Sequence, residues 1–200
     1  MHPVIGSLIS RVFYENEIQN GIPGKERITG IPGYDDVSIE WITTSKMPEL
    51  KRKEEKIGND EKATYKNSSE ISIIKSKLHE LDLLSTKVVK VGVITAYRGQ
   101  KSAIKEMVKQ QIDTVDAFQG GQKEIIIYST VRSSNTNGIG FLKSEARLNV
   151  SLSRAQSLLI IVGDLNFLNN TKITGNKFPD IIEYIKETKG CKITEVGENL

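Results

Sequence analysis

Three short apolar runs constrain the fold of this chain more than any other feature of its sequence. They are residues 88–95 (VVKVGVIT), 125–131 (IIIYSTV) and 158–162 (LLIIV). Strands that are buried on both faces of a parallel sheet have this near-continuous apolar composition. Segments with helical spacing alternate with these runs, at residues 99–111, 145–155 and 180–189. The alternation predicts an α/β fold with a mostly parallel central sheet covered on both faces.

The two ends of the chain add weaker signals. Residues 4–14 place apolar side chains at helical spacing directly after Pro3, a residue that suits the first turn of a helix. Residues 20–33 hold four glycines and two prolines and are interpreted as loop. Residues 37–44 alternate apolar and polar side chains, which predicts a strand, and residues 192–196 are a further candidate strand.

Residues 45–66 form a charged insertion. They are rich in lysine and glutamate, contain few apolar residues and show no periodicity, so we expect a solvated and partly disordered loop. Asn67 follows as a candidate helix cap, with Glu70 three residues later and an apolar stripe beyond it. The role of the insertion stays open at this point.

Length and composition place limits on the function. Two hundred residues suit a single domain, and the net charge of +3 permits a local nucleic-acid-binding patch without demonstrating one. Cys191 is the only cysteine, and the only histidines, His2 and His79, lie far apart. We therefore expect no disulfide, no bound metal and no zinc site. The sequence has no membrane-length apolar run and no secretory signal, so an intracellular location away from membranes is expected.

Three polar or glycine-bearing segments follow the predicted strands, at residues 95–100, 114–124 and 147–155. In open α/β sheets, ligands bind at the carboxyl ends of the strands, and we expect all three segments there. Each segment has an ordinary alternative. The first can be strand-to-helix capping, and Gly120–Gly121 can be a turn as well as a close approach to a ligand. Asp116 can be a metal ligand, a base or a cap.

The third segment carries arginines at helical spacing. Arg147, Ser151 and Arg154 are predicted to share one face of a helix, opposite Leu148 and Leu152. An arginine on such a face can reach across a cleft and stabilise a transferring phosphoryl group. The alternative is a solvated basic face with ion pairs.

Taken together and in this order, these segments resemble the motifs of one family. Residues 95–100 (TAYRGQ) resemble a T-P-Y-x-x-Q motif, and residues 115–120 (VDAFQG) resemble V-D-x-F-Q-G-x-E-K-D. Residues 131–135 (VRSSN), 138–142 (GIGFL) and 147–155 (RLNVSLSRA) resemble S-x-V-R-x-N, G-x-G-F-L and R-L-N-V-A-L-T-R-A. The chain thereby resembles the second RecA-like domain of superfamily 1 helicases of the nonsense-mediated-decay, senataxin and Dna-two-like type.

The resemblance implies a RecA-like three-layer sandwich, a P-loop NTPase-type fold that lacks the P-loop itself. It implies ATP and Mg²⁺ as cofactors of a longer parent protein, single-stranded DNA or RNA as its track, and an N-terminal RecA-like domain as partner. By motif position, Arg154 is the arginine finger, and Gly120 and Gln122 lie near the nucleotide. The candidates for contact with the nucleic acid are Thr95, Tyr97, Thr114, Arg132 and Asn149.

The sequence also departs from the family pattern. Gln122 stands where the family has glutamate, so an amide replaces a carboxylate at a nucleotide contact, and Ala96 replaces a proline. The sequence contains neither a G-x-x-x-x-G-K-[ST] loop nor a D-E-x-x element. We therefore expect this chain alone neither to bind ATP tightly nor to hydrolyse it. A non-catalytic nucleic-acid-binding module is the alternative; a dinucleotide-binding domain lacks its G-x-G-x-x-G motif.

Overall fold

The computed structural model describes residues 1–59, 63–106, 108, 111–118, 121–134, 138–170 and 172–197. The main sheet contains β1 (Ile39–Thr43), β4 (Val91–Thr95), β5 (Gln111–Thr114), β6 (Lys123–Ser129), β7 (Ala155–Gly163) and β8 (Cys191–Glu195). Its strand order is β5-β4-β6-β7-β1-β8, and its paired strands run parallel. The helices are α1 (Pro3–Phe13), α2 (Glu49–Arg52), α3 (Ser68–Leu84), α4 (Arg98–Lys105), α5 (Glu145–Leu152), α6 (Leu165–Leu168) and α7 (Phe178–Glu187).

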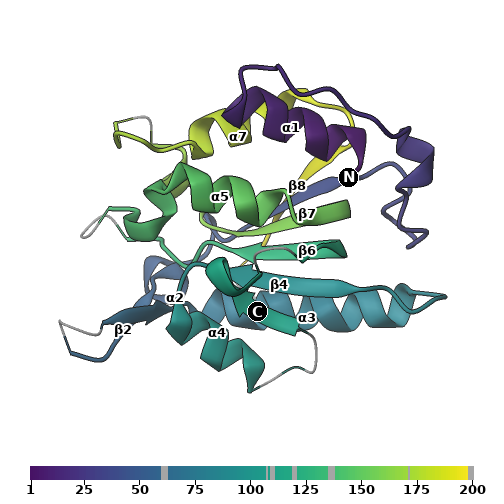
Figure 1. The fold of residues 1–200 in the computed structure, drawn as a ribbon. Helices are drawn as coiled ribbons and strands as arrows, with labels where there is room; N and C mark the ends of the chain where they lie inside the picture. Colours follow the sequence, from purple (N-terminus) through teal and green to yellow (C-terminus); the bar gives the residue numbers. More distant parts are fainter. Residues whose placement is uncertain are drawn as a thin grey trace.

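Helices cover both faces of the sheet and complete three layers. α1, α5 and α7 lie on one face, and α3 and α4 lie on the other (Figure 1). Alternate residues of the central strands supply the two cores: Ile126 and Tyr128 face the first group of helices, while Ile125 and Ile127 face the second. This two-sided burial explains why the strands appear in the sequence as unbroken apolar runs. The predicted α/β, RecA-like sandwich is confirmed.

The predicted helix at residues 99–111 is too long. α4 ends at Lys105, and residues 111–114 form β5, the edge strand beside β4. With only four residues and a single neighbour, β5 lacks the continuous apolar run of a central strand. The strand predicted at residues 88–95 begins only at Val91, whereas the final strand is found where it was expected.

The expectation of a loose charged loop at residues 45–66 is also wrong for its described part. That part contains α2 and an antiparallel hairpin of β2 (Glu55–Ile57) and β3 (Thr64–Lys66). Charged side chains tie it to the main sheet. Arg52 pairs with the buried carboxylate of Asp164, and Glu54 forms an ion pair with Arg132 at 3.1 Å. The composition of the insertion predicted a solvated loop. It contains no information about these anchoring partners, because they are distant in sequence.

The Glu54–Arg132 pair gives a stability test of this correction. Both side chains are only 2% exposed, and Glu54 also accepts hydrogen bonds from Ser133 N at 2.9 Å and Ser134 Oγ at 2.7 Å. Removing one partner leaves a buried charge unpaired, so we expect Glu54→Ala to lower the free energy of unfolding by about 3–5 kcal/mol. Urea denaturation measures this loss. Glu49→Ala, at an exposed position of α2, is the control; equal effects of the two substitutions would show that the insertion is not anchored.

Candidate functional site

The predicted site residues divide between two opposite edges of the sheet. Thr95 and Thr114 are the last residues of β4 and β5 and are register partners, which places them at the carboxyl edge. Gln122 and Arg154 directly precede β6 and β7, whose first residues pair with each other, which places them at the amino edge. The expectation that all three segments lie at the carboxyl ends is therefore wrong for Gln122 and Arg154.

The reason lies in the connections between parallel strands. Each connection must return from the carboxyl edge to the amino edge before the next parallel strand begins. The segment between β5 and β6 makes this return through a 3-10 turn, Asp116–Phe118, and passes β4, which lies between the two strands. Phe118 packs on Gly92 of β4, where an added Cβ would lie 2.7 Å from the phenyl ring. α5 makes the second return, from the carboxyl edge to Arg154.

Arg154 is held in place by its own turn at the amino edge. Its Nε donates to the carbonyl of Val150 at 3.0 Å, and its Nη2 donates to Ser153 Oγ at 3.2 Å. Its carbonyl accepts from Lys123 N at 3.1 Å, which links this turn to the start of β6. Arg154 is half-buried, and its guanidinium carries five N–H donors. The structure thus orients an arginine at the surface without using all of its donors in these contacts.

Gln122 lies on the same edge, close to the start of β7. Its Oε1 accepts a hydrogen bond from Gln156 Nε2 at 3.2 Å, and this hydrogen bond is exposed to solvent. An amide pair of this kind can open to offer a donor and an acceptor to a ligand. Gly120, the other predicted nucleotide contact, lies outside the described residues.

A groove of about 470 Å³ adjoins Arg154. Its lining comes from α1, from residues 18–22 and from the end of α5. Asn149 is part of that lining, and its Nδ2 donates to the Tyr14 hydroxyl at 2.9 Å. The structure therefore groups Asn149 with Arg154 rather than with the other predicted nucleic-acid contacts.

The carboxyl edge carries a larger cavity of about 810 Å³. Tyr97 and Thr114, both predicted contacts, line it together with Thr64 from the hairpin. Tyr97 is 3% exposed, and this burial is the main reason why its pKa rises to about 12. The cavity also contains Phe141 and Arg147, so it combines aromatic, hydroxyl and cationic groups.

A row of aromatic rings leads to this cavity: Tyr97 and Phe141 line it, and Tyr65 packs against Tyr97. The centroids of Tyr65 and Tyr97 are 5.5 Å apart at 84°, and those of Tyr97 and Phe141 are 5.9 Å apart at 68°. The guanidinium of Arg132 lies 4.3 Å from the centroid of Tyr65. Sequence reasoning did not select Tyr65 or Phe141. Phe141 falls in the recognised GIGFL segment, whereas Tyr65 carries no signal of its own in the insertion.

Burial argues against a direct strand contact by two of the predicted residues. Arg132 is 1% exposed, and its Nη2 donates to the carbonyl of Gly138 at 2.9 Å in addition to the ion pair with Glu54. Thr95 is fully buried, and its hydroxyl oxygen accepts a hydrogen bond from Tyr97 N at 3.4 Å. For Arg132 and Thr95, the predicted contact with a nucleic acid therefore does not fit their positions. Arg132 instead lies against the ring of Tyr65, and Thr95 accepts a hydrogen bond from the backbone of Tyr97.

The predicted shared face of Arg147, Ser151 and Arg154 is wrong for Arg154, which lies beyond the end of the helix. α5 ends at Leu152, Ser151 is buried with its hydroxyl on the Arg147 carbonyl, and the two arginines line different cavities. Arg147 pairs with Asp116, with Nε–Oδ1 at 3.2 Å and Nη2–Oδ2 at 3.3 Å. Asp116 thus acts as the partner of an arginine here, a role that differs from the three considered from the sequence.

A buried polar network supports the carboxyl edge. Glu70 is fully buried and accepts from Ser129 Oγ at 2.6 Å, Thr130 Oγ1 at 3.3 Å and Val131 N at 2.9 Å. Gln100 donates to Ser129 Oγ at 2.9 Å. Burial raises the pKa of Glu70 to about 8, against the hydrogen bonds from Ser129, Val131 and Thr130, which lower it.

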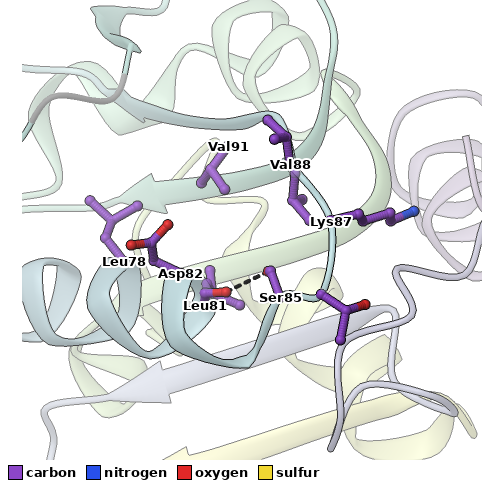
Figure 2. Close-up of a pocket in the computed structure, with 9 residues that line it drawn as sticks. Leu78, Leu81, Asp82, Ser85, Lys87, Val88 and Val91 are labelled. Atoms are coloured by element: carbon purple, nitrogen blue, oxygen red, sulfur yellow. Dashed lines mark hydrogen bonds between the residues drawn. The ribbon is translucent and has the colours of Figure 1, made fainter.

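A third hollow, of about 450 Å³, lies between the end of α3 and the start of β4 (Figure 2). Leu78, Leu81 and Val91 form its apolar part, and Asp82 and Lys87 supply charges at its margin. Lys87 pairs with Glu124 at 3.2 Å. This hollow includes none of the residues that the sequence predicted for the site.

The described part of the chain offers neither a membrane-spanning helix nor a cluster of metal ligands. Of the helices in those ranges, none has the length and apolar content needed to cross a membrane. Within the same ranges, no three His, Cys, Asp or Glu side chains come together as a metal site would require.

Known proteins are similar to this chain over most of its length. A family described as an AAA domain matches residues 1–166. A "Regulator of nonsense transcripts 1 homolog" from Neurospora crassa is 34% identical over 82% of this chain and 16% of its own length. "Helicase sen1" from Schizosaccharomyces pombe is 31% identical over 91% of this chain and 11% of its own, and "5'-3' DNA helicase ZGRF1" from Mus musculus is 31% identical over 87% and 9%. The chain thus spans less than a fifth of each of these relatives.

The buried carboxyl of Glu70 predicts a pH dependence of stability. Its pKa of about 8 in the folded chain exceeds the ordinary value near 4.3 in the unfolded chain, so between these values the folded state binds the extra proton. We therefore expect the free energy of unfolding to fall as the pH rises from about 5 to 8, by at most ~1.4 kcal/mol per pH unit. Urea denaturation across this range should show the slope in the wild type and lose it in Glu70→Gln. Glu26→Gln, at an exposed position, is the control; parallel profiles for wild type and Glu70→Gln would contradict the assignment.

Proposed function

Because this chain belongs to the superfamily 1 helicases of the nonsense-mediated-decay and senataxin type, we propose that it is the C-terminal motor domain of such a helicase. In this proposal it supplies the arginine finger and part of the surface that binds a single strand. The observation that carries the proposal is the separation of two polar sites on opposite edges of one sheet. α5 joins them, with Arg147 in the carboxyl-edge cavity and Arg154 just beyond its other end.

The nucleotide end of the proposal rests on Arg154. The two hydrogen bonds to Val150 and Ser153 fix the guanidinium at the sheet edge before any ligand arrives, so little side-chain order has to be gained on binding. The ligand proposed is ATP with Mg²⁺, bound against an N-terminal RecA-like domain of the parent protein. A fixed guanidinium stabilises the charge that develops on a transferring phosphoryl group, and such fingers contribute about 10³- to 10⁵-fold in rate.

Gln122 and Gly120 complete the nucleotide side of the proposal by motif position. The amide of Gln122 retains an acceptor for a ribose hydroxyl, since within the described residues its Oε1 is engaged in the exposed contact with Gln156 at 3.2 Å, which a ligand can open. It lacks the charge of the usual carboxylate, so we expect a weaker contact. Asn149, beside Arg154, fits a role at this edge better than a role in strand binding.

The nucleic-acid end of the proposal rests on the carboxyl-edge cavity. Tyr97 and Thr114 line it, and Arg147 gives it positive charge. Arg132 and Thr95 act behind this surface, Arg132 through the ring of Tyr65 and Thr95 through the backbone of Tyr97.

The role of Arg154 can be tested by ATP hydrolysis in a protein that joins this domain to a domain with a Walker A loop. We expect Arg154→Ala to lower strand-stimulated turnover by about 10³-fold or more while leaving strand binding within about twofold, because Arg154 lies at the edge opposite the proposed strand surface. Arg11→Ala removes an arginine whose ion pairs with Glu183 and Glu187 are on the surface, and it should change neither quantity. Near-normal turnover of Arg154→Ala would overturn the finger assignment.

A second candidate function is favoured by one observation, the amide at position 122. A domain that has lost its nucleotide contact would be a nucleic-acid-binding module without a motor. Gln122→Glu separates the two: a motor should keep or gain nucleotide affinity, whereas a module should show no ATP turnover in either form. A parent protein with no hydrolysis under any strand condition, but with salt-sensitive binding of about 0.7 log units per phosphate contact per tenfold salt, would establish the module.

A further inference from the structure

Phe141 is an exposed aromatic residue at the mouth of the carboxyl-edge cavity. It belongs to the 3-10 turn Gly140–Lys143, and 58% of its surface is accessible. Its contact with Tyr97 is edge to face rather than stacked, at 68°. Most of a large apolar ring is thus open to solvent beside a cavity that polar and apolar residues line together.

Arg147 adjoins this ring. Its guanidinium carbon lies 5.6 Å from the Phe141 centroid, and its ion pair with Asp116 is exposed, at 44% and 69% for the two side chains. Exposed ion pairs contribute little to stability because water and salt screen them. The guanidinium can therefore exchange the Asp116 carboxylate for another anion at small cost, while remaining over the ring.

The combination fits one ligand chemistry. Aromatic faces and arginine planes stack with unpaired bases, and arginine also binds the phosphates between them. The cavity of about 810 Å³ behind Phe141 offers the Thr114 hydroxyl and an apolar floor at Val115. A single nucleotide unit, with its base on the ring and its phosphate on the cation, matches these groups.

We propose that Phe141 is a base-stacking residue for single-stranded nucleic acid and that Arg147 binds the adjoining phosphate, with Asp116 holding Arg147 while the strand is absent. The proposal rests on the proposed function for the nature of the ligand. It adds the residue on which the base lies and the ion pair that the strand displaces. It also gives the β2–β3 hairpin a role, because Tyr65 supports Tyr97, and Tyr97 in turn supports Phe141.

Fluorescence of Phe141→Trp tests the stacking directly in the 200-residue chain. Trp41 is the only native tryptophan and is fully buried, so its emission is a constant background. We expect oligo(dT) or oligo(rU) of twelve nucleotides to quench the new tryptophan, with the two polymers titrated separately to show which sugar is preferred. Val88→Trp, at a position that is 94% exposed near the amino edge, should show no quenching.

Affinities from labelled oligonucleotides give the second arm. We expect Phe141→Ala to weaken binding about tenfold or more, and Phe141→Leu to weaken it nearly as much because leucine keeps apolar surface but no ring. Arg147→Gln should reduce the slope of log affinity against log salt by about 0.7. Asp116→Asn should strengthen binding, since it removes the competing carboxylate. Urea midpoints of all variants check that they fold.

The outcomes separate this inference from the proposed function. Quenching at position 141 but not at 88, together with the affinity losses, supports both. Strand binding by the wild type without a response at position 141, or with equal affinity of Phe141→Ala, overturns the stacking role and leaves the strand surface of the proposed function in place. Failure of the wild type to bind either oligonucleotide at low salt overturns both.

Discussion

The buried carboxyl group of Glu70 holds the backbone turn on which the carboxyl edge of the sheet depends. Val131 follows β6 with φ of 69°, a left-handed conformation that is strained for a β-branched residue. Its N–H donates to both oxygens of Glu70, at 2.9 and 3.0 Å, and its carbonyl accepts from Asn67 Nδ2 at 3.0 Å. Hydrogen bonds to both peptide groups that flank Val131 hold its φ and ψ in this conformation. The cost of the strain, about 1–3 kcal/mol, is therefore offset within the same turn.

This turn decides where the neighbouring functional groups lie. It leads directly into Arg132, whose guanidinium reaches Glu54 and the ring of Tyr65 in the hairpin. Asn67 secures the other side of the arrangement, because the same Nδ2 that holds Val131 also donates to the carbonyl of Arg52 at 2.7 Å. The insertion is thus fixed by the start of α3 as well as by Arg132. Without the strained turn, the aromatic row would lose the support beneath Tyr65.

The sequence predicted the layers better than the edges. Alternating apolar runs were sufficient to predict a parallel sheet between helices, and Asn67 was correctly identified as a helix cap, since its Oδ1 accepts from Glu70 N at 3.1 Å. The partner expected in that capping arrangement was not predictable. The side chain of Glu70 turns to Val131, and the N–H of Asn67 is satisfied by Gln100 Oε1 at 2.8 Å instead. Gln100 is 33 positions from Asn67, and Val131 is 61 positions from Glu70. Local spacing contains no information about partners at these distances. The two-edge division of the site was missed for the same reason, because it depends on strand order and not on the sequence of motifs.

α5 is the physical connection between the two edges. Leu148 and Leu152 are buried at 1% and 0% exposure against the sheet, so this short helix is one packed body. Arg147 lies in the first turn of α5, and Arg154 lies two residues beyond the last residue of the helix. At the rise of an α-helix, this separation of seven positions corresponds to about 10 Å. In the proposed function, an anion bound by Arg147 and an anion bound by Arg154 would therefore act on the two ends of one packed helix. Coupling between distant sites requires an element with two positions that both sites bias. Gly138 and Gly140, with φ of 57° and 53°, lie in the connection that precedes α5, where backbone freedom can accommodate such a shift. If the proposed strand site is correct, the Asp116–Arg147 pair is where such coupling would begin, because this ion pair is exposed and another anion can replace the carboxylate at small cost.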